Sequence, residues 1–170
     1  MDAALSQYLL QAAKVSPILE VFVRFFATWA IVILAGLAIA CTWRHKWHGV
    51  TALFVAVVAA FAINVSIGTL IPRERPFYTE RTQPLFVPMS EKSLPSDHAA
   101  LAFSLTGVVW FYCRRPRAAA VAIAVGIAIA RVMAGVHYPA DVVVGAVVGL
   151  IGAAISIRLV GRPYALSLHK

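Results

Sequence analysis

Five uncharged apolar runs constrain this chain more than any other feature of its sequence. Residues 25–43 and 49–71 are each long enough to span a bilayer, which takes about 20 apolar residues in helical form. Runs 99–113, 118–130 and 142–157 are shorter, and each ends against a polar residue: His98, Arg131 and Asp141. Extending each run past that residue restores a spanning length. We therefore expect five transmembrane helices, with polar groups slightly inside the membrane boundary, where ionisable residues are costly and usually functional.

The composition supports a membrane protein of one domain over residues 1–170. Apolar residues make up 61% of the chain and charged residues 13%, whereas an average soluble domain has roughly 45–50% and about 25%. This excludes a soluble globular domain, a disordered chain and a secreted disulfide scaffold. Residues 3–15 form an amphipathic pattern typical of a helix lying in the membrane interface. Asp2 and the absence of a basic start argue against a signal peptide. The expected fold class is an all-α, polytopic membrane helical bundle.

The net charge of +8 is an orientation signal and does not indicate nucleic-acid binding. One set of loops carries eight basic residues and no acid: Arg44, Lys46, Arg114, Arg115, Arg117, Arg158, Arg162 and Lys170. The other set holds seven basic residues and all seven acids. The positive-inside rule then places the N-terminus outside and the C-terminus in the cytoplasm. Cys41 and Cys113 fall at cytoplasmic ends, where a reducing environment argues against a disulfide.

Three polar clusters, far apart in the sequence, are predicted to project from the same outer side. The first contains Arg73 and Arg75, between two prolines. The second follows Pro95, and the third lies between the fourth and fifth spans. The residues of these last two clusters are Ser96, Asp97 and His98, and then Arg131, His137 and Asp141.

This set of side chains suits the binding and transfer of a phosphoryl group. Arginine offers a planar fork of donors for phosphate oxygens, and Ser96 occupies the expected N-cap of a helix, whose free amides attract anions. Asp141, four residues after His137, can accept a hydrogen bond from one ring nitrogen and leave the other free to attack. His98, on another helix, would be the acid. Charge neutralisation, an in-line nucleophile and a proton for the leaving oxygen are what phosphoryl transfer needs.

Each cluster also has a reading without catalysis. Arg73 and Arg75 could be interfacial residues whose side chains snorkel towards water. Ser96 and His98 alone would usually mark a helix start. His137 and Asp141 could be half of a metal site, although no third strong ligand lies beside them and the arginines would repel a cation. If the site has no function, all three of these non-catalytic explanations must apply at once to clusters that face the same side.

These residues resemble the type 2 phosphatidic acid phosphatase (PAP2) superfamily, whose signatures are Lys-x6-Arg-Pro, Pro-Ser-Gly-His and Ser-Arg-x5-His-x3-Asp. The match covers residues from about 64 to 145. The resemblance implies that His137 is the nucleophile forming a phosphohistidine, that Asp141 orients it, and that His98 protonates the leaving group. Arg75, Ser96 and Arg131 would hold the phosphate. It also implies a helical bundle with an outer-face site that works without a metal or cofactor.

Three departures refine the resemblance. Gly68 stands where the first signature has lysine, which Arg73 is predicted to replace in part; Ala130 stands where the third has serine; and Asp97 replaces a glycine. Asp97, Asn64 and the missing lysine are similar to the bacterial undecaprenyl pyrophosphate phosphatases of the bacitracin-resistance type. The expected function is therefore hydrolysis of undecaprenyl diphosphate to the monophosphate at the external face of a bacterial plasma membrane, recycling the lipid carrier of cell-wall synthesis.

Other functions remain open. The substrate could be another lipid phosphate (phosphatidic acid, phosphatidylglycerol phosphate or lipid A), or the phosphoryl group could pass to a lipid or sugar acceptor instead of water. A non-catalytic protein that captures lipid headgroups is the remote alternative. The expected partners are a polyprenyl or other phospholipid substrate and the membrane lipid.

Overall fold

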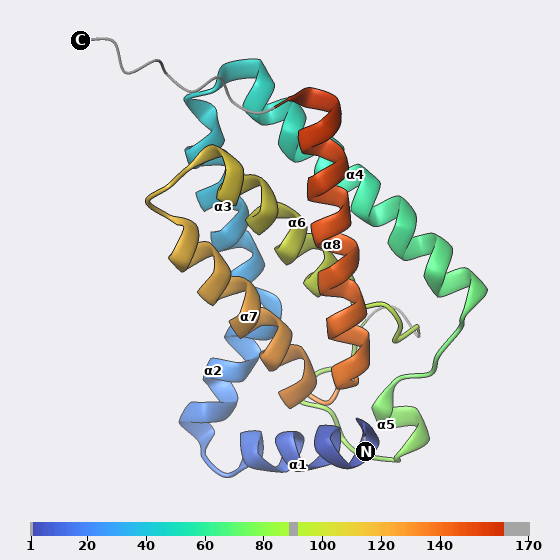
Figure 1. The fold of residues 1–170 in the computed structure, drawn as a ribbon. Coiled ribbons are helices and arrows are strands. Elements are labelled where there is room, and N and C mark those ends of the chain that lie inside the picture. The colour runs from blue at the N-terminus through green and yellow to red at the C-terminus, as the bar shows by residue number, and fades with distance from the viewer. Residues whose placement is uncertain (1, 89–91, 162–170) are drawn as a thin grey trace.

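The protein is a bundle of helices in a computed structural model that describes residues 2–88 and 92–161 (Figure 1). Within those residues there is no β-strand, only an isolated bridge between Glu74 and Lys92. The expected all-α class is confirmed. The helices, in chain order, are α1 (Asp2–Lys14), α2 (Pro17–Thr28), α3 (Ala30–Trp43), α4 (Lys46–Leu70), α5 (Pro76–Thr79), α6 (Asp97–Tyr112), α7 (Arg117–Met133) and α8 (Pro139–Val160).

Helix α8 packs closely against both α4 and α6, and small residues allow the approach. A Cβ added at Gly145 would lie 2.6 Å from the carbonyl oxygen of Ser96 in α6's N-cap, and one added at Gly152 would lie 2.6 Å from that of Ala56 in α4. Real side chains do not fit at such distances, so glycine is required at both positions. This contact holds the start of α8, with Asp141, next to the start of α6.

The first predicted span is broken. Residues 25–43 were expected to form one helix, but α2 ends at Thr28 and α3 begins at Ala30, with a bend of 47° between them. Trp29 lies at the break and is exposed. Aromatic side chains of this kind prefer the membrane interface. The sequence around the bend contains no proline or glycine from which the bend could be predicted.

Among the described residues, two helices are long and apolar enough to cross a membrane, α4 and α8. The α2–α3 pair would be a third if it forms one bent span. Helices α6 and α7 have 16 and 17 residues, just short of the usual length. The apolar helices make this a membrane protein, while the count of five spans stays a prediction.

Helix α1 crosses the end of the bundle where the α7–α8 connection lies (Figure 1). Leu10 and Ala13 are buried there against Ala134 and Val136, while Tyr8 is exposed. The expected amphipathic helix at the N-terminus is present, and its place in the membrane interface stays a prediction.

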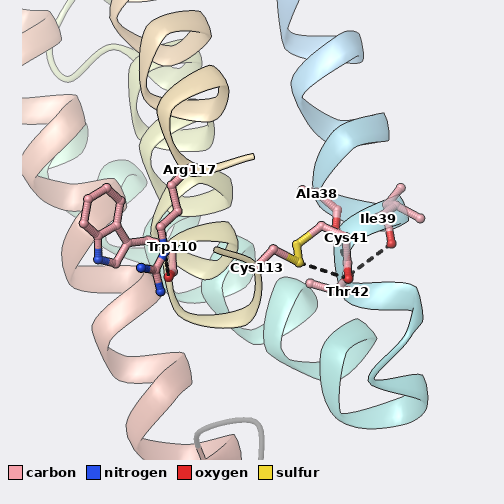
Figure 2. The surroundings of a disulfide bond; sticks show 7 residues. All are labelled: Ala38, Ile39, Cys41, Thr42, Trp110, Cys113 and Arg117. Carbon is pink, nitrogen blue, oxygen red and sulfur yellow. Dashed lines mark hydrogen bonds between the residues drawn. A yellow bond between two sulfur atoms is a disulfide. The ribbon is translucent and has the colours of Figure 1, made fainter. Parts of the chain in front are cut away.

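The two cysteines form a disulfide, which the sequence analysis argued against. Cys41 near the end of α3 and Cys113 just after α6 have Cα atoms 6.1 Å apart and are bonded to each other (Figure 2). That separation lies in the usual range for a disulfide. The expectation was wrong because it rested on the compartment alone, whereas the packing of α3 against α6 brings these two helix ends together.

Candidate active site

Three segments meet at the end of the bundle that α1 covers. They are residues 73–75 in the α4–α6 connection, residues 93–98 around the start of α6, and residues 131–141 around the α7–α8 connection. Backbone hydrogen bonds join them: Ser93 N donates to Arg73 O at 2.8 Å, and Ser96 N donates to Asp141 O at 3.0 Å. Backbone hydrogen bonds between these segments therefore hold the site together, and the packed helices position the ends of each segment.

His137 lies at the centre of this site with only 2% of its surface exposed. Its Nδ1 is 2.8 Å from the carbonyl oxygen of Ser93. Its Nε2 is 3.2 Å from Arg75 Nη1 and 3.3 Å from Arg131 Nη2. A carbonyl can only accept and a guanidinium can only donate, so Nδ1 carries the proton and Nε2 presents its lone pair to the two arginines.

Arg75 and Arg131 are both buried, and backbone carbonyls hold each in place. Arg75 Nη1 also donates to Val136 O at 2.8 Å, and Arg131 Nη1 donates to Ala27 O at 3.1 Å. Arg131 Nε has no hydrogen-bond partner among the described residues. Two guanidiniums converging on one nucleophilic nitrogen, with Arg131 Nε as an additional donor, make a site for an anion such as a phosphoryl group.

This environment keeps the imidazole of His137 neutral. Burial is the largest cause, and together with the charges of Arg131 and Arg75 it lowers the pKa of His137 to about 4, against the opposing effect of Asp141. Burial also lowers the pKa of Arg75, against the attraction of Asp97 and Asp141. At neutral pH the site therefore combines an uncharged imidazole with a cationic arginine beside it.

Asp141 is fully buried, but it does not form the hydrogen bond to His137 that was expected. Its Oδ2 lies 3.9 Å from Nδ1, an ion-pair distance. That oxygen instead accepts from Ser93 Oγ at 2.5 Å and from Tyr138 N at 2.8 Å. The reason is its place in the first turn of α8, where a carboxylate naturally receives the free amides of the helix start. Asp141 thus fixes the two residues that flank the imidazole.

The Arg73 side chain contacts two carboxylates. Its Nη1 donates to Asp141 Oδ1 at 2.8 Å and its Nη2 donates to Asp2 Oδ2 at 2.7 Å. Its guanidinium lies 4.0 Å from the ring centroid of Tyr138. These contacts place Arg73 beside Asp141, and its predicted part in binding the phosphate stays a prediction.

The second cluster lines the side of the site next to α4. Ser96 is the N-cap residue of α6, as predicted, but its hydroxyl makes no capping bond and is buried without a partner among the described residues. Asp97 Oδ1 accepts from Asn64 Nδ2 at 2.6 Å. Asp97 and His98 border a pocket of about 250 Å³, whose other walls are mostly apolar side chains of α3, α4 and α6.

Residues 49–164 match the sequence profile of the PAP2 superfamily. The chain belongs to the PAP2 superfamily. The three clusters named above all fall inside the matched range. Their convergence at one end of the bundle places the PAP2 signature residues around one buried histidine.

Two curated relatives are similar over part of the chain. The bacitracin transport permease protein BcrC of Bacillus licheniformis is 31% identical over 100 residues, which are 58% of this chain and 49% of that protein. A protein of Escherichia coli K12, provisionally named undecaprenyl-diphosphatase YbjG, is 30% identical over 119 residues, 68% of this chain and 59% of that protein. The chain thus matches about half to three fifths of these relatives' length.

Two solved structures share the fold. The crystal structure of Aquifex aeolicus LpxE has a TM-score of 0.78 and 29% identity, covering 92% of this chain and 94% of that one. The structure of a transmembrane PAP2-type phosphatidylglycerolphosphate phosphatase from Bacillus subtilis has a TM-score of 0.71 and 23% identity, covering 91% and 82%. The second likeness concerns the fold alone.

Lys92 lies beside Gly68, the position at which the first PAP2 signature has a lysine. Lys92 packs against Gly68, with its Cδ 4.0 Å from the point where a Cβ at residue 68 would lie. Lys92, Ser93, Tyr138 and the contacts of Asp2 were not predicted from the sequence as parts of the site. Ser93 lies two residues before the Pro95-Ser96 motif. Its backbone carbonyl, which no residue type signals, accepts the hydrogen bond from His137 Nδ1.

Proposed function

We propose that this PAP2 protein hydrolyses the diphosphate of a polyprenyl lipid, undecaprenyl diphosphate, to the monophosphate and inorganic phosphate. The observation that carries the proposal is the geometry at His137. Its Nδ1 proton is fixed on the Ser93 carbonyl, and its Nε2 lone pair faces Arg75 and Arg131 at 3.2 and 3.3 Å. A phosphoryl group placed between the arginines and Nε2 would take over these donors and meet the nucleophile in the same place.

The proposed reaction has two steps. In the first, Nε2 of His137 attacks the terminal phosphorus, and the bond to the bridging oxygen breaks, releasing the lipid monophosphate and leaving a phosphohistidine. His98 is proposed to give a proton to the leaving oxygen. In the second step, the deprotonated His98 accepts a proton from water while the water oxygen attacks the phosphorus of the phosphohistidine. The P–N bond breaks, its electron pair returns to Nε2, and inorganic phosphate leaves with His137 neutral and His98 protonated again. Arg75, Arg131 and Ser96 hold the transferring oxygens in both steps.

The arginines supply the charge that phosphoryl transfer requires, so we propose a mechanism that needs no metal and no cofactor. The negative charge of the transition state is spread over the equatorial oxygens. Buried guanidiniums at fixed positions stabilise such a charge more strongly than water does. The buried Ser96 hydroxyl and Arg131 Nε are two polar groups ready to receive these oxygens.

A diphosphate substrate is supported by Asp97, by Asn64 and by the relatives. YbjG carries a diphosphatase name and BcrC a bacitracin name. Asn64 holds the Asp97 carboxylate at the mouth of the pocket of about 250 Å³ beside His98. The apolar walls of that pocket suit the first part of a lipid chain, which supports a scissile bond between His98 and His137.

A second candidate is a phosphatase for another lipid phosphate. The match to the PAP2 superfamily does not distinguish among lipid phosphates, so phosphatidylglycerol phosphate, phosphatidic acid and lipid A belong to this group of candidate substrates. Transfer of the phosphoryl group to a lipid or sugar acceptor would use the same intermediate. A non-catalytic protein that captures headgroups is the remote alternative, in which His137 would have no function.

We propose that the site faces the outside of a bacterial plasma membrane. The charge distribution supports this, because the loops at the other end of the bundle are basic and lack acids. The N-terminus would then be outside and the C-terminus in the cytoplasm, with five spans when α6, α7 and the bent α2–α3 pair each cross the membrane.

The test is phosphate release in detergent from a substrate panel, with EDTA present. We expect undecaprenyl diphosphate to react faster than phosphatidic acid or phosphatidylglycerol phosphate, and His137→Asn to lose at least 1000-fold in kcat. The matched control is His48→Asn, a histidine at the opposite end, which should retain full activity. Faster turnover of a monoester would overturn the substrate, whereas activity in His137→Asn, or loss of activity on adding EDTA, would overturn the mechanism.

A further inference from the structure

A second cavity, of about 780 Å³, lies at the end of the bundle remote from His137. It is lined by the final residues of α3, α6 and α8, by the beginning of α4 and by the α6–α7 connection. Figure 1 shows these helix ends together on the side opposite α1 and α5. Its size falls in the range of ordinary ligand sites, roughly 300–1,000 Å³. Neither the PAP2 signatures nor the proposed reaction uses any of its residues.

The lining of this cavity is basic and contains no acid. Arg44, Arg114 and Arg115 border it, together with His45 and His48. Within the described part of the chain, none of the three arginines has a carboxylate within 4.0 Å. The described carboxylates all lie on α1, α2 or the segments that build the candidate active site, namely Asp2, Glu20, Glu74, Glu80, Asp97 and Asp141. The cavity therefore attracts an anion that the described residues do not supply.

Apolar side chains form the rest of the wall. Leu37 and Ala40 of α3 and Val160 of α8 line it, next to Pro116. A free inorganic anion would gain nothing from such a surface, whereas a molecule with a charged head and apolar chains would use both parts. Basic pockets between membrane helices on the cytoplasmic side are a recurrent kind of site for anionic lipid headgroups.

The wall of the cavity is fixed before any ligand binds. The disulfide between Cys41 and Cys113 links α3 to the end of α6 (Figure 2). Tyr112 OH donates to Gly161 O at 3.3 Å, tying α6 to the end of α8. The ring of His45 packs edge-on against Tyr112, with centroids 5.1 Å apart. A rigid wall lowers the ordering penalty of binding.

We propose that this cavity binds the headgroup of an anionic phospholipid, such as phosphatidylglycerol, from the membrane leaflet opposite the phosphatase site. The three arginines contact the phosphate, and the acyl chains lie along Leu37, Ala40 and Val160. The bound lipid would stabilise the end of the bundle where α3, α6 and α8 meet. This proposal is independent of the substrate at His137, because it concerns other residues and a phosphodiester that the proposed reaction does not cleave.

The experiment uses the purified full chain in neutral detergent and a phosphatidylglycerol that carries a photoactivatable group in one acyl chain. After irradiation and digestion, we expect labelled peptides to cover residues 37–48 and 112–117. Unlabelled phosphatidylglycerol should compete and phosphatidylcholine should not. Labelling confined to residues 72–80 or 130–141 would place the lipid at the phosphatase site and overturn the proposal.

Charge-matched variants separate the cavity from general attraction to the surface. Arg114→Gln/Arg115→Gln should lower the labelling at least tenfold, on the scale of about 1 kcal/mol per basic residue near a lipid surface. Lys46→Gln/Arg158→Gln removes the same charge at the same end, outside the lining, and should leave it within twofold. Equal losses in both pairs would overturn the proposal. Phosphate release should be unchanged in Lys46→Gln/Arg158→Gln, and a single symmetric peak in size-exclusion chromatography shows that both variants are folded.

The source of the anion is tested by competition. Inorganic phosphate and glycerophosphoglycerol, the headgroup without its chains, should compete at least 100-fold more weakly than phosphatidylglycerol. Competition at equal concentration would mean that the cavity recognises a free phosphate, and the lipid assignment would be wrong. Native mass spectrometry should show one phosphatidylglycerol retained per chain, and none in Arg114→Gln/Arg115→Gln.

Discussion

Replacing Asp141 by asparagine separates two ways in which this carboxylate could act on His137. In a direct arrangement the carboxylate accepts the Nδ1 proton, and its loss lets the ring adopt the wrong tautomer, an effect of about 10⁴-fold in kcat in hydrolases built that way. In this structure the Ser93 carbonyl accepts that proton at 2.8 Å, and Asp141 lies 3.9 Å away. The tautomer should therefore survive the substitution.

The magnitude follows from what the carboxylate still contributes. At 3.9 Å and an effective dielectric constant of ~20, a full negative charge would stabilise a cationic imidazole by about 4 kcal/mol. Arg73, at 2.8 Å from Asp141 Oδ1 and 2.7 Å from Asp2 Oδ2, offsets part of that charge. What remains is support of neighbouring groups, and the loss of such support typically lowers activity by about 10–100-fold, or roughly 1.4–2.7 kcal/mol. We therefore expect Asp141→Asn to lose about 10–100-fold in kcat.

The assay is initial-rate phosphate release, with thermal unfolding measured on the same preparations. Because Ser93 Oγ donates to Asp141 at 2.5 Å, Ser93→Ala should cost only a few-fold in kcat, and its effect should largely disappear in the Asp141→Asn background. A loss of 10⁴-fold or more in Asp141→Asn, at unchanged unfolding temperature, would refute the reasoning and make Asp141 the direct partner of the imidazole.

Three further predictions concern the pH profile, the helix packing and the disulfide. Because the pKa of His137 is lowered to about 4, kcat/KM, corrected for the ionisation of the substrate, should stay constant as the pH falls through 6.5 and should decline only towards pH 4. A decline of kcat/KM centred at pH 6.5 would contradict this. Gly145→Ala should destabilise the protein by about 1–3 kcal/mol in thermal unfolding, whereas Gly36→Ala, with nothing within 4 Å, should not. Cys41 and Cys113 should react with maleimide only after reduction, and labelling without reductant would contradict the disulfide.

The sequence predicted the parts of the site that rest on side-chain type and missed those that rest on the backbone. Arg75, Arg131 and His137 meet as expected, because each lies at an end of an apolar run and the runs pack side by side. The Ser93 carbonyl could not be foreseen, since every residue has one. The role of Arg73 depends on Asp2, 71 residues away, and no local pattern encodes that pairing.

The fold shows the same division. Long apolar runs predicted α4 and α8 because burial in lipid depends on composition. The break at Trp29 was missed because it depends on how α2 and α3 pack against α7. The disulfide was rejected on the basis of compartment, although the contact between two helix ends decides whether the two sulfurs can meet.

The most direct measurement is the trapping of a phosphorylated enzyme. The substrate of the panel that turns over fastest, labelled with ³²P in its terminal phosphate, is mixed with the protein and quenched in alkali within one turnover. We expect a label that is stable to alkali and labile to acid, maps to His137, and is present in His48→Asn but absent from His137→Asn. A label on another residue, or full turnover by His137→Asn, would contradict the assignment of His137 as the nucleophile.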